Sequence, residues 1–303
     1  MPSWVSARRS SKCPTTPAGL PERWRRSNAS RRAAGRENPE ERTRTVLEEL
    51  FGVAGKVVLV TGGSRGIGLA IAEGFVKCGA RVYLCSRNAE ACALAEKELS
   101  QYGECRAIPA DLGTAEGRRA LTAELTARED RLDVLINNAG AIWAETLDDY
   151  PESGWDKVFD LNVKGSFFLV QALVPLLREA ATPDAPARVI NIGSIDGFHI
   201  PHHETYAYSS SKAAVHQLSR HLAAQLARES ITVNVIAPGM FPSKMLKGTV
   251  EKHGEAAVLA PVPLKRFVSP SDMAGAAIYL ASHAGSYVTG AVLPVDGGTA
   301  TTL

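Results

Sequence analysis

The sequence predicts an α/β fold, with one doubly wound parallel sheet of seven strands in a single domain. Seven short runs rich in β-branched residues alternate with longer segments whose apolar residues recur every three or four positions. Small, amide or glycine residues follow several of these runs, and no repeat or linker interrupts the pattern after residue 50. Such alternation gives a parallel sheet with helices on both faces and ligands at the carboxyl ends of its strands.

The composition is that of a soluble globular protein. The chain has 303 residues, of which 45% are hydrophobic and 22% charged. A membrane span needs an apolar run of roughly 18 to 20 residues. We find no such run in the sequence and therefore expect no membrane segment. The five cysteines form neither a Cys-x-x-Cys pair nor a Cys/His ligand spacing. This predicts reduced thiols, a cytoplasmic protein and no metal site.

Residues 1–45 are predicted to be a disordered basic extension, and residues 46–303 the folded domain. The first 36 residues contain nine Lys or Arg and one acid, Glu22, without apolar periodicity. Such a segment buries too little surface to offset its ordering entropy. An organellar transit peptide, a nucleic-acid-binding arm and an export signal are the alternatives to a solvated extension. The remaining chain is slightly acidic, so we expect no nucleic-acid partner for the domain.

The first predicted strand leads into a glycine-rich turn. After a short helical turn at Val46–Phe51, the run Lys56–Thr61 is apolar and β-branched, and Gly62-x-x-x-Gly66-x-Gly68 follows before a helix at Leu69–Lys77. Glycine lets the backbone approach a pyrophosphate, and a helix N-terminus offers free N–H groups. The spacing is neither the G-x-G-x-x-G fingerprint nor a P-loop. Its position between a buried strand and a helix nevertheless favours a dinucleotide phosphate site.

The second predicted strand, Arg81–Cys85, ends at Ser86 and Arg87. An NAD-binding unit usually carries an acid here to hold the ribose 2′-hydroxyl, and this chain has none. Arg87 at the strand end and Arg65 in the glycine turn suit a 2′-phosphate instead. The sequence therefore predicts NADP(H) as the cofactor.

Two further strands end in residues suited to contact with a ligand. After a helix at about 88–102, the strand Cys105–Pro109 leads to Asp111-Leu112. After another helix, the strand Leu132–Ile136 leads to Asn137-Asn-Ala-Gly140. Small and amide residues at a strand end allow the backbone to approach a ligand closely.

A strongly apolar helix is predicted at residues 155–178. It contains Asn162, and Pro175 should bend or end it. The strand Arg188–Ile192 follows and carries Gly193 and Ser194 at its end. Ser194 should therefore lie at the same edge of the sheet as the glycine turn.

The carboxyl-terminal part is predicted to contain two more strands. The first, Ile231–Ile236, ends at Pro238-Gly239, and the second is Ala291–Val295. Residues 240–262 are predicted to be rich in loops, and Pro270–Ser282 to be a helix.

Tyr208 and Lys212 are four residues apart in a segment whose apolar stripe predicts a helix. Both side chains then lie on one face. An ammonium beside a phenol favours the phenolate and lowers a pKa that is otherwise about 10. Tyr208 would become a proton donor or acceptor near neutral pH. Tyr206 lacks this partner, because position 210 is Ser.

In order and approximate spacing, these motifs resemble the short-chain dehydrogenase/reductase family. The matching segments are Thr61-Gly-x-x-x-Gly-Ile-Gly68, Asn137-Asn-Ala-Gly140, Asn162, Ser194, Tyr208-x-x-x-Lys212 and Pro238-Gly239. The resemblance covers about residues 50–303 and implies a Rossmann-type fold. Ala207-Tyr-Ser-Ser-Ser-Lys212 and the segment 234–243 are similar to NADPH-dependent 3-oxoacyl-[acyl carrier protein] reductases, especially the rhamnolipid-associated type.

The resemblance implies four catalytic residues. Tyr208 would give a proton to a substrate carbonyl as hydride arrives from the nicotinamide, and Ser194 would hydrogen-bond the carbonyl oxygen. Lys212 would lower the pKa of Tyr208 and bind the nicotinamide ribose, while Asn162 would hold a water that relays protons to Lys212.

The expected cofactor contacts combine the glycine turn, the two arginines and the segments matched by resemblance. Asp111 would contact the adenine, and the segment 238–243 the nicotinamide amide; Ser243 stands where the family often has Thr. The full expected set is Gly62, Ser64, Arg65, Gly66, Ile67, Gly68, Arg87, Asp111, Leu112, Asn138, Ala139, Gly140, Tyr208, Lys212, Pro238, Gly239 and Ser243.

The sequence does not decide between several classes of substrate. A 3-oxoacyl thioester, small or carried on a protein, is the first expectation. A sugar, polyol, steroid or xenobiotic ketone is the alternative, and a non-catalytic NADP(H)-binding protein is the third. His199, His202 and His203 would lie at the substrate mouth, and Met240, Phe241, Met245 and Leu246 would form an apolar lid or a plain packing surface. By resemblance we expect a homodimer or homotetramer that buries the helices around 155–178 and 206–228.

Overall fold

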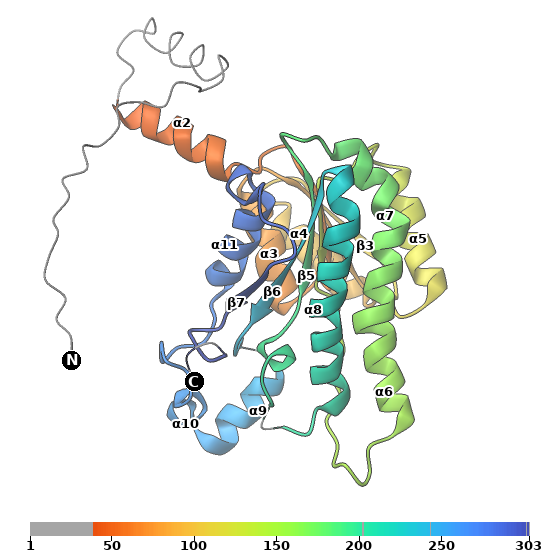
Figure 1. The fold of residues 1–303 in the computed structure, drawn as a ribbon, viewed down its shortest axis with the longest axis vertical. Helices are drawn as coiled ribbons and strands as arrows, with labels where there is room; N and C mark the ends of the chain where they lie inside the picture. The colour runs from red at the N-terminus through yellow and green to blue at the C-terminus, as the bar shows by residue number, and fades with distance from the viewer. Residues whose placement is uncertain (1–38, 202, 243, 301, 303) are drawn as a thin grey trace, which may run out of the picture. The chain divides into compact units, whose positions relative to one another are not determined.

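A seven-stranded parallel sheet forms the centre of the protein, as predicted (Figure 1). The computed structural model describes residues 39–201, 203–242, 244–300 and 302. Residues 47–303 form one compact unit. The strand order is β3-β2-β1-β4-β5-β6-β7, and every neighbouring pair is parallel. The strands are β1 Val57–Thr61, β2 Arg81–Ser86, β3 Cys105–Pro109, β4 Val134–Asn137, β5 Ala187–Ile192, β6 Ile231–Pro238 and β7 Val292–Val295.

This strand order places the ligand edge. The chain runs outward from β1 to β3 and then returns to the other side of β1 with β4. In open α/β sheets, ligands bind outside the carboxyl ends of the strands at such a reversal. The glycine turn after β1 and the Asn-Asn-Ala-Gly segment after β4 flank this point.

Helices cover both faces of the sheet, because alternate strand residues point to opposite sides. Val58 and Val60 pack with α3, α4 and α11, whereas Val57 and Leu59 pack with α5, α7 and α8. Both faces are fully buried, which explains why the strands are continuous apolar runs. The helices are α2 Pro39–Phe51, α3 Gly66–Lys77, α4 Ala89–Leu99, α5 Ala115–Thr126, α6 Glu152–Phe159, α7 Ser166–Ala180, α8 Tyr206–Leu226, α9 Lys244–His253, α10 Glu255–Leu259 and α11 Pro270–Ala281.

Several predicted elements differ from the structure. Residues 240–262 were expected to be mostly loop, yet they contain α9 and α10. The helix predicted at 155–178 is α6, a π-helical segment η1 at Asp160–Gly165, and α7. Pro175 does not end α7, which continues to Ala180. The helical turn expected at 46–51 is the end of α2, which begins at Pro39. The prediction of a disordered extension was therefore wrong for residues 39–45, and its residues 1–38 lie outside the described residues.

The helical stretch Glu152–Ala180 has the length and composition of a membrane span, contrary to the sequence expectation. About two fifths of its apolar window is buried (39%), and that part packs in the core of this fold. Leu169, Leu173 and Leu177 of α7 are buried in the cluster that covers β1, β4 and β5. An apolar helix against a two-sided sheet needs no lipid to explain its hydropathy.

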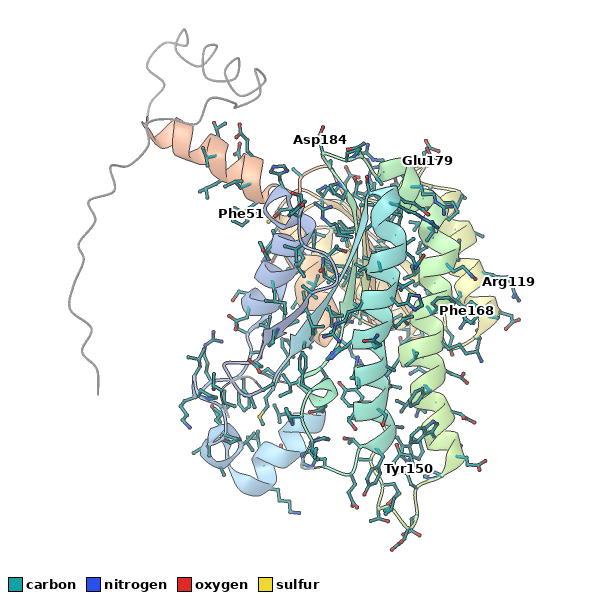
Figure 2. The ribbon with its side chains drawn as sticks, viewed as in Figure 1. Phe51, Arg119, Tyr150, Phe168, Glu179 and Asp184 are labelled. Carbon is teal, nitrogen blue, oxygen red and sulfur yellow. The ribbon has the colours of Figure 1, made fainter. Side chains whose placement is uncertain are left out.

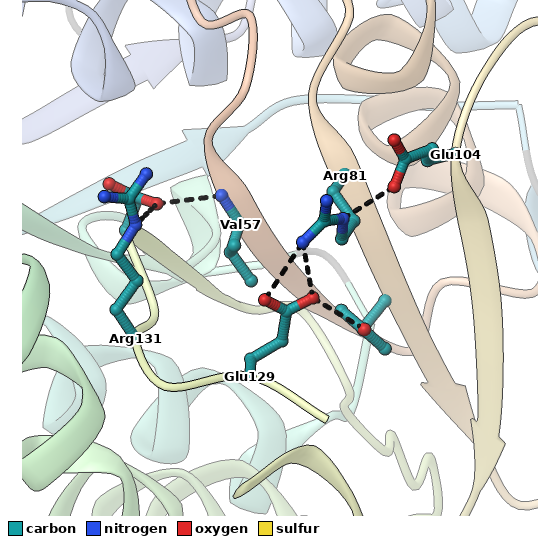
Figure 3. A network of polar contacts seen from close by, with 7 residues as sticks. Val57, Arg81, Glu104, Glu129 and Arg131 are labelled. Carbon is teal, nitrogen blue, oxygen red and sulfur yellow. Dashed lines mark hydrogen bonds and ion pairs between the residues drawn. The ribbon is translucent and has the colours of Figure 1, made fainter. Parts of the chain in front are cut away.

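Polar contacts fasten the amino ends of the strands, opposite the ligand edge (Figure 3). The buried Glu129 carboxylate accepts hydrogen bonds from Arg81 Nη1 at 3.1 and 3.2 Å and from the Tyr83 hydroxyl at 2.7 Å. Asp133 Oδ2 accepts from the Val57 backbone N–H at 2.8 Å. In β5, the buried Arg188 guanidinium donates to the carbonyls of Pro186, Leu280 and Ser282. This end is thus occupied by structural contacts.

Candidate functional site

Tyr208 and Lys212 lie in the first two turns of α8, as their spacing predicted. Lys212 is buried and donates a hydrogen bond from Nζ to the Ile192 carbonyl, at 2.8 Å. The same Nζ is 5.5 Å from the centroid of the Tyr208 ring. Ile192 ends β5, two residues before Ser194. The end of β5 and the start of α8 therefore bring Ser194, Tyr208 and Lys212 together.

The electrostatics of Tyr208 differ from the sequence prediction. Burial raises the pKa of Tyr208 to about 12; a hydrogen bond from Ser194 opposes this, and the Asp196 charge adds to it. Lys212 was expected to lower this pKa, but its ammonium points to the Ile192 carbonyl instead of the phenol oxygen. Burial also lowers the pKa of Lys212 to about 8, against the attraction of Asp196. Desolvation outweighs the pairwise effect that the spacing predicted.

Ser194 caps the short 3₁₀ segment η2 (Ile195–Gly197) that follows β5. Its Oγ accepts a hydrogen bond from the Asp196 N–H at 3.1 Å, which leaves the Ser194 O–H free to donate. The lowering effect of Ser194 on the pKa of Tyr208 corresponds to such a donation to the phenol oxygen. The two hydroxyls are therefore close together, and a carbonyl oxygen held between them could accept a hydrogen bond from each.

Asn162 fastens the loop after β4 to α8. Its side chain donates to the Ala141 carbonyl at 3.0 Å and accepts from the Ala141 N–H at 2.7 Å. It also donates to Ser211 Oγ at 2.9 Å, and Ser211 donates to the Tyr208 carbonyl at 2.7 Å. The π-helical segment η1 places this amide inward, a frequent role of such segments at functional sites. Asn162 therefore holds the backbone around Tyr208; a relay water remains a prediction.

The glycine turn has room for a phosphate group. Gly62 and Gly66 have φ of +64° and +58°, a region that side chains disfavour. A Cβ on Gly62 would meet the Asn138 side chain at 2.7 Å, whereas a Cβ on Gly66 would meet nothing within 4 Å. Next to Gly66, α3 begins without a side-chain cap and without an acidic residue in its first turn. No capping or acidic side chain of its own first turn thus occupies the positive dipole end of α3, which fits a dinucleotide pyrophosphate.

Arg65 and Arg87 lie on either side of this edge and are both exposed. Ser64 and Ser86, the neighbours of the two arginines, are joined by a hydrogen bond of 2.9 Å, so the turn and the end of β2 are adjacent. Neither guanidinium forms an ion pair with another residue that the structure describes. Two free cations with no acid at the strand end fit a ribose 2′-phosphate.

The remaining expected contacts reach the same edge in different ways. Asn138 donates from Nδ2 to the carbonyls of Thr61 and Gly62, at 2.9 and 3.2 Å, so its amide braces the glycine turn. Asp111 and Leu112 follow β3, and Asp111 accepts from the Gly113 N–H. Ile67, Ala139 and Gly140 lie in the turn and loop that surround the site, and Pro238-Gly239 ends β6 beside β7. His202 and Ser243 lie outside the described residues.

Sequence reasoning missed several residues that shape the site. Thr61 Oγ1 accepts the N–H groups of Asn138 and Ala139, both at 2.9 Å, and so joins the ends of β1 and β4. Asp196 acts electrostatically on Tyr208 and Lys212. His216 is buried behind Ser194, where a Cβ on Gly193 or Gly197 would overlap its ring. Its spacing of four from Lys212 was visible in the sequence; the other two contacts depend on tertiary structure. Of the expected lid, Phe241 packs against the core.

The fold and this site define a class: a dinucleotide-binding oxidoreductase with a Ser–Tyr–Lys arrangement at the carboxyl-terminal edge of a parallel sheet. A family model described as enoyl-(acyl carrier protein) reductase matches residues 62–300. The chain belongs to the short-chain dehydrogenase/reductase family.

Among its relatives is the rhamnolipids biosynthesis 3-oxoacyl-[acyl-carrier-protein] reductase of Pseudomonas aeruginosa, 52% identical over 83% of this chain and 99% of the relative. The 5-keto-D-gluconate 5-reductase of Escherichia coli is 34% identical over 83% of this chain and 98% of that protein. A solved structure, the Pseudomonas aeruginosa RhlG/NADP active-site complex, has a TM-score of 0.81 and 51% identity over 83% of this chain and 99% of the other.

Proposed function

We propose that the protein is an NADPH-dependent reductase that converts a ketone to a secondary alcohol, and that its substrate is a 3-oxoacyl thioester. A relative at 52% identity over nearly its full length carries that activity in its name. The observation that supports the chemistry most directly is the proximity of Ser194, Tyr208 and Lys212 at the carboxyl end of β5: Lys212 Nζ is 5.5 Å from the Tyr208 ring centroid, and Ser194 acts to lower the pKa of Tyr208.

Tyr208, Ser194 and Lys212 have different roles in the proposed reduction. The Tyr208 hydroxyl donates its proton to the substrate carbonyl oxygen, and the Ser194 hydroxyl donates a hydrogen bond to the same oxygen as negative charge develops there. Lys212, fixed by the Ile192 carbonyl, supplies a positive charge beside them. Because burial raises the pKa of Tyr208 to about 12, its phenol is protonated at neutral pH and ready to act as an acid.

We propose that NADP(H) lies along the edge from the glycine turn to Ser194. The pyrophosphate would lie at Gly66 and the start of α3, and the 2′-phosphate between Arg65 and Arg87. When bound, NADPH supplies the hydride that reduces the carbonyl carbon. The solved relative in complex with NADP supports this cofactor.

The test is NADPH oxidation with a medium-chain 3-oxoacyl thioester and a panel of unrelated ketones, with NADH in parallel. Tyr208→Phe should lower kcat by about 100-fold or more, because it removes the proton donor while leaving the ring. Tyr206→Phe is the matched control, since its exposed hydroxyl bonds Glu204 two residues away on the same segment. NADPH binding should survive in both variants. Full turnover by Tyr208→Phe would overturn the mechanism.

A sugar-type ketone is the second candidate substrate. It is favoured by the relative named as a 5-keto-D-gluconate reductase, although at 34% identity. In the same panel, turnover of keto-sugars without turnover of the thioester would keep the mechanism and replace the substrate class. NADPH binding without turnover of any ketone would favour a non-catalytic binding protein.

We further propose a cytoplasmic homodimer or homotetramer. The four cysteines in the described part of the chain, Cys78, Cys85, Cys92 and Cys105, are free thiols, which suits a reducing compartment. Trp155 of α6 is 41% exposed. Phe168 of α7 is 40% exposed (Figure 2). Large exposed apolar side chains on neighbouring helices are typical of an interface between subunits.

A further inference from the structure

Asp196 is a carboxylate beside the reacting groups for which the proposed mechanism has no use. It lies in η2, two residues after Ser194, and its backbone N–H orients Ser194 Oγ. The side chain is 24% exposed, so its charge is only partly solvated. Its charge acts on both Tyr208 and Lys212. A ketone held between the two hydroxyls would therefore experience this charge.

The groups that face Asp196 are cationic or can become so. Lys212 approaches from α8, and His199 and His203 belong to the connection between η2 and α8. His199 Nε2 is 3.9 Å from Asp196 Oδ1. Since His199 Nδ1 bonds the Ile200 carbonyl, which can only accept, Nδ1 carries a hydrogen and only Nε2 can face the carboxylate. Burial raises the pKa of Asp196, and these three groups lower it.

Removing the Asp196 charge would leave Lys212 uncompensated. Lys212 Nζ bonds a neutral carbonyl, that of Ile192. A buried ammonium without a counter-charge attracts anions, and its field is strong where water is largely excluded. With the carboxylate present, that attraction is offset, and a second negative charge nearby is disfavoured.

We propose that Asp196 is a specificity-determining residue that excludes ketones bearing their own carboxylate, so that the substrate presents an uncharged group, such as an ester or thioester, beside its ketone. This inference rests on the proposed carbonyl reduction. It separates the two substrate classes that the names of the relatives suggest: the acyl chain of a thioester is neutral near its ketone, whereas a keto-gluconate is an anion. Specificity of this kind comes from a repulsive element as much as from attraction.

The experiment compares two substrates that differ in charge but share the ketone: ethyl acetoacetate and acetoacetate. The ratio of their kcat/KM values is measured with NADPH at about pH 7, where the acetoacetate carboxylate is ionised and Lys212, with a pKa of about 8, is mostly charged. Wild-type protein should prefer the ester. Asp196→Asn keeps the shape and the backbone N–H and should lower the preference about tenfold, through a gain on acetoacetate. Asp196→Glu keeps the charge and should keep the preference.

Asp184→Asn is the matched control. It removes one exposed carboxylate from the loop before β5, at the end of the molecule opposite Tyr150 (Figure 2). Tyr150 packs on Tyr206, at the start of α8 and thus near the site, with ring centroids 5.6 Å apart. The control should retain the wild-type ratio. Raising the salt concentration from about 0.05 to about 0.5 M should reduce the wild-type preference more than that of Asp196→Asn, since salt screens charge.

The outcomes are distinct. A lower ester preference in Asp196→Asn alone supports the proposal. If wild-type protein turns over the ester but Asp196→Asn has the same ratio, the proposal is overturned and the proposed reduction is left intact. An equal loss of activity on both substrates has the same consequence, because it indicates a structural role for Asp196. No turnover of either compound or of any ketone in the panel by wild-type protein overturns the proposed function, and this inference with it.

Discussion

The free energy of unfolding should depend on pH through one buried histidine, His216. It lies one helical turn after Lys212 on α8, and Nε2 has no hydrogen-bond partner among the described residues. The Phe198 ring packs on it, with centroids 4.7 Å apart. Burial, together with the positive charges of Lys212 and Arg220, lowers the pKa of His216 to about 4. The folded protein thus holds this imidazole neutral.

The size of the effect follows from the two pKa values. In the unfolded chain the pKa is the ordinary 6.5, so between pH 6.5 and pH 4 the unfolded state binds more protons than the folded state. Stability from this group is therefore present above pH 6.5 and is lost as the pH falls toward 4. A shift of this size gives a loss of roughly 2 kcal/mol between pH 7 and pH 4.5.

Urea unfolding of wild-type protein and of His216→Leu, at fixed protein concentration and without cofactor, measures this loss. Carboxylates contribute to acid sensitivity in both proteins, so the difference between their free energies of unfolding isolates the histidine. That difference should shift by roughly 2 kcal/mol in favour of the variant from pH 7 to pH 4.5. His221→Leu removes an exposed histidine of the same helix and is the control. Parallel pH profiles for wild type and His216→Leu would refute the reasoning.

Two further results are expected. Arg87→Ala should lower kcat/KM for NADPH about tenfold or more and leave kcat/KM for NADH unchanged, because it removes a charged donor to the 2′-phosphate. Arg119→Ala is the control, since Arg119 is an exposed arginine on α5 (Figure 2). An equal loss with both cofactors would contradict the role of Arg87. Phe168→Glu should reduce the molar mass measured by light scattering toward that of one 32.3 kDa chain, and an unchanged mass would remove this face from the interface.

The sequence predicted those features that depend on local pattern. Buried parallel strands need apolar residues on both faces, so runs such as Val57–Thr61 were recognisable without a structure. The glycine turn, the absence of an acid after β2, and the spacing of Tyr208 and Lys212 likewise are short-range signals. Their meeting at one sheet edge followed from the rule that parallel strands end together.

What the sequence did not predict depends on tertiary burial or on competing contacts. The segment 240–262 has weak periodicity, and its helices α9 and α10 could not be separated from loop by pattern. The π-helical segment η1 has an additional residue in its turn, and the spacing of apolar residues in the sequence does not predict it. The pKa of Tyr208 was expected to fall because Lys212 is near in sequence. In the structure the Lys212 ammonium donates to the Ile192 carbonyl instead, and burial has the largest effect on the pKa of Tyr208.

The raised pKa of Tyr208 determines how the rates of reduction and of the reverse oxidation depend on pH. A phenol with a pKa of about 12 is almost fully protonated at pH 7 to 8 and gives a proton readily only to a stronger base, which a carbonyl oxygen becomes as it gains negative charge. Alcohol oxidation would require the same oxygen as a phenolate, which burial and the Asp196 charge both disfavour. Because burial and the Asp196 charge both hold Tyr208 protonated, the rate of alcohol oxidation should rise with pH, whereas the rate of reduction should not. Asp196→Asn removes a negative charge beside the phenol and should shift the rise in the oxidation rate to lower pH.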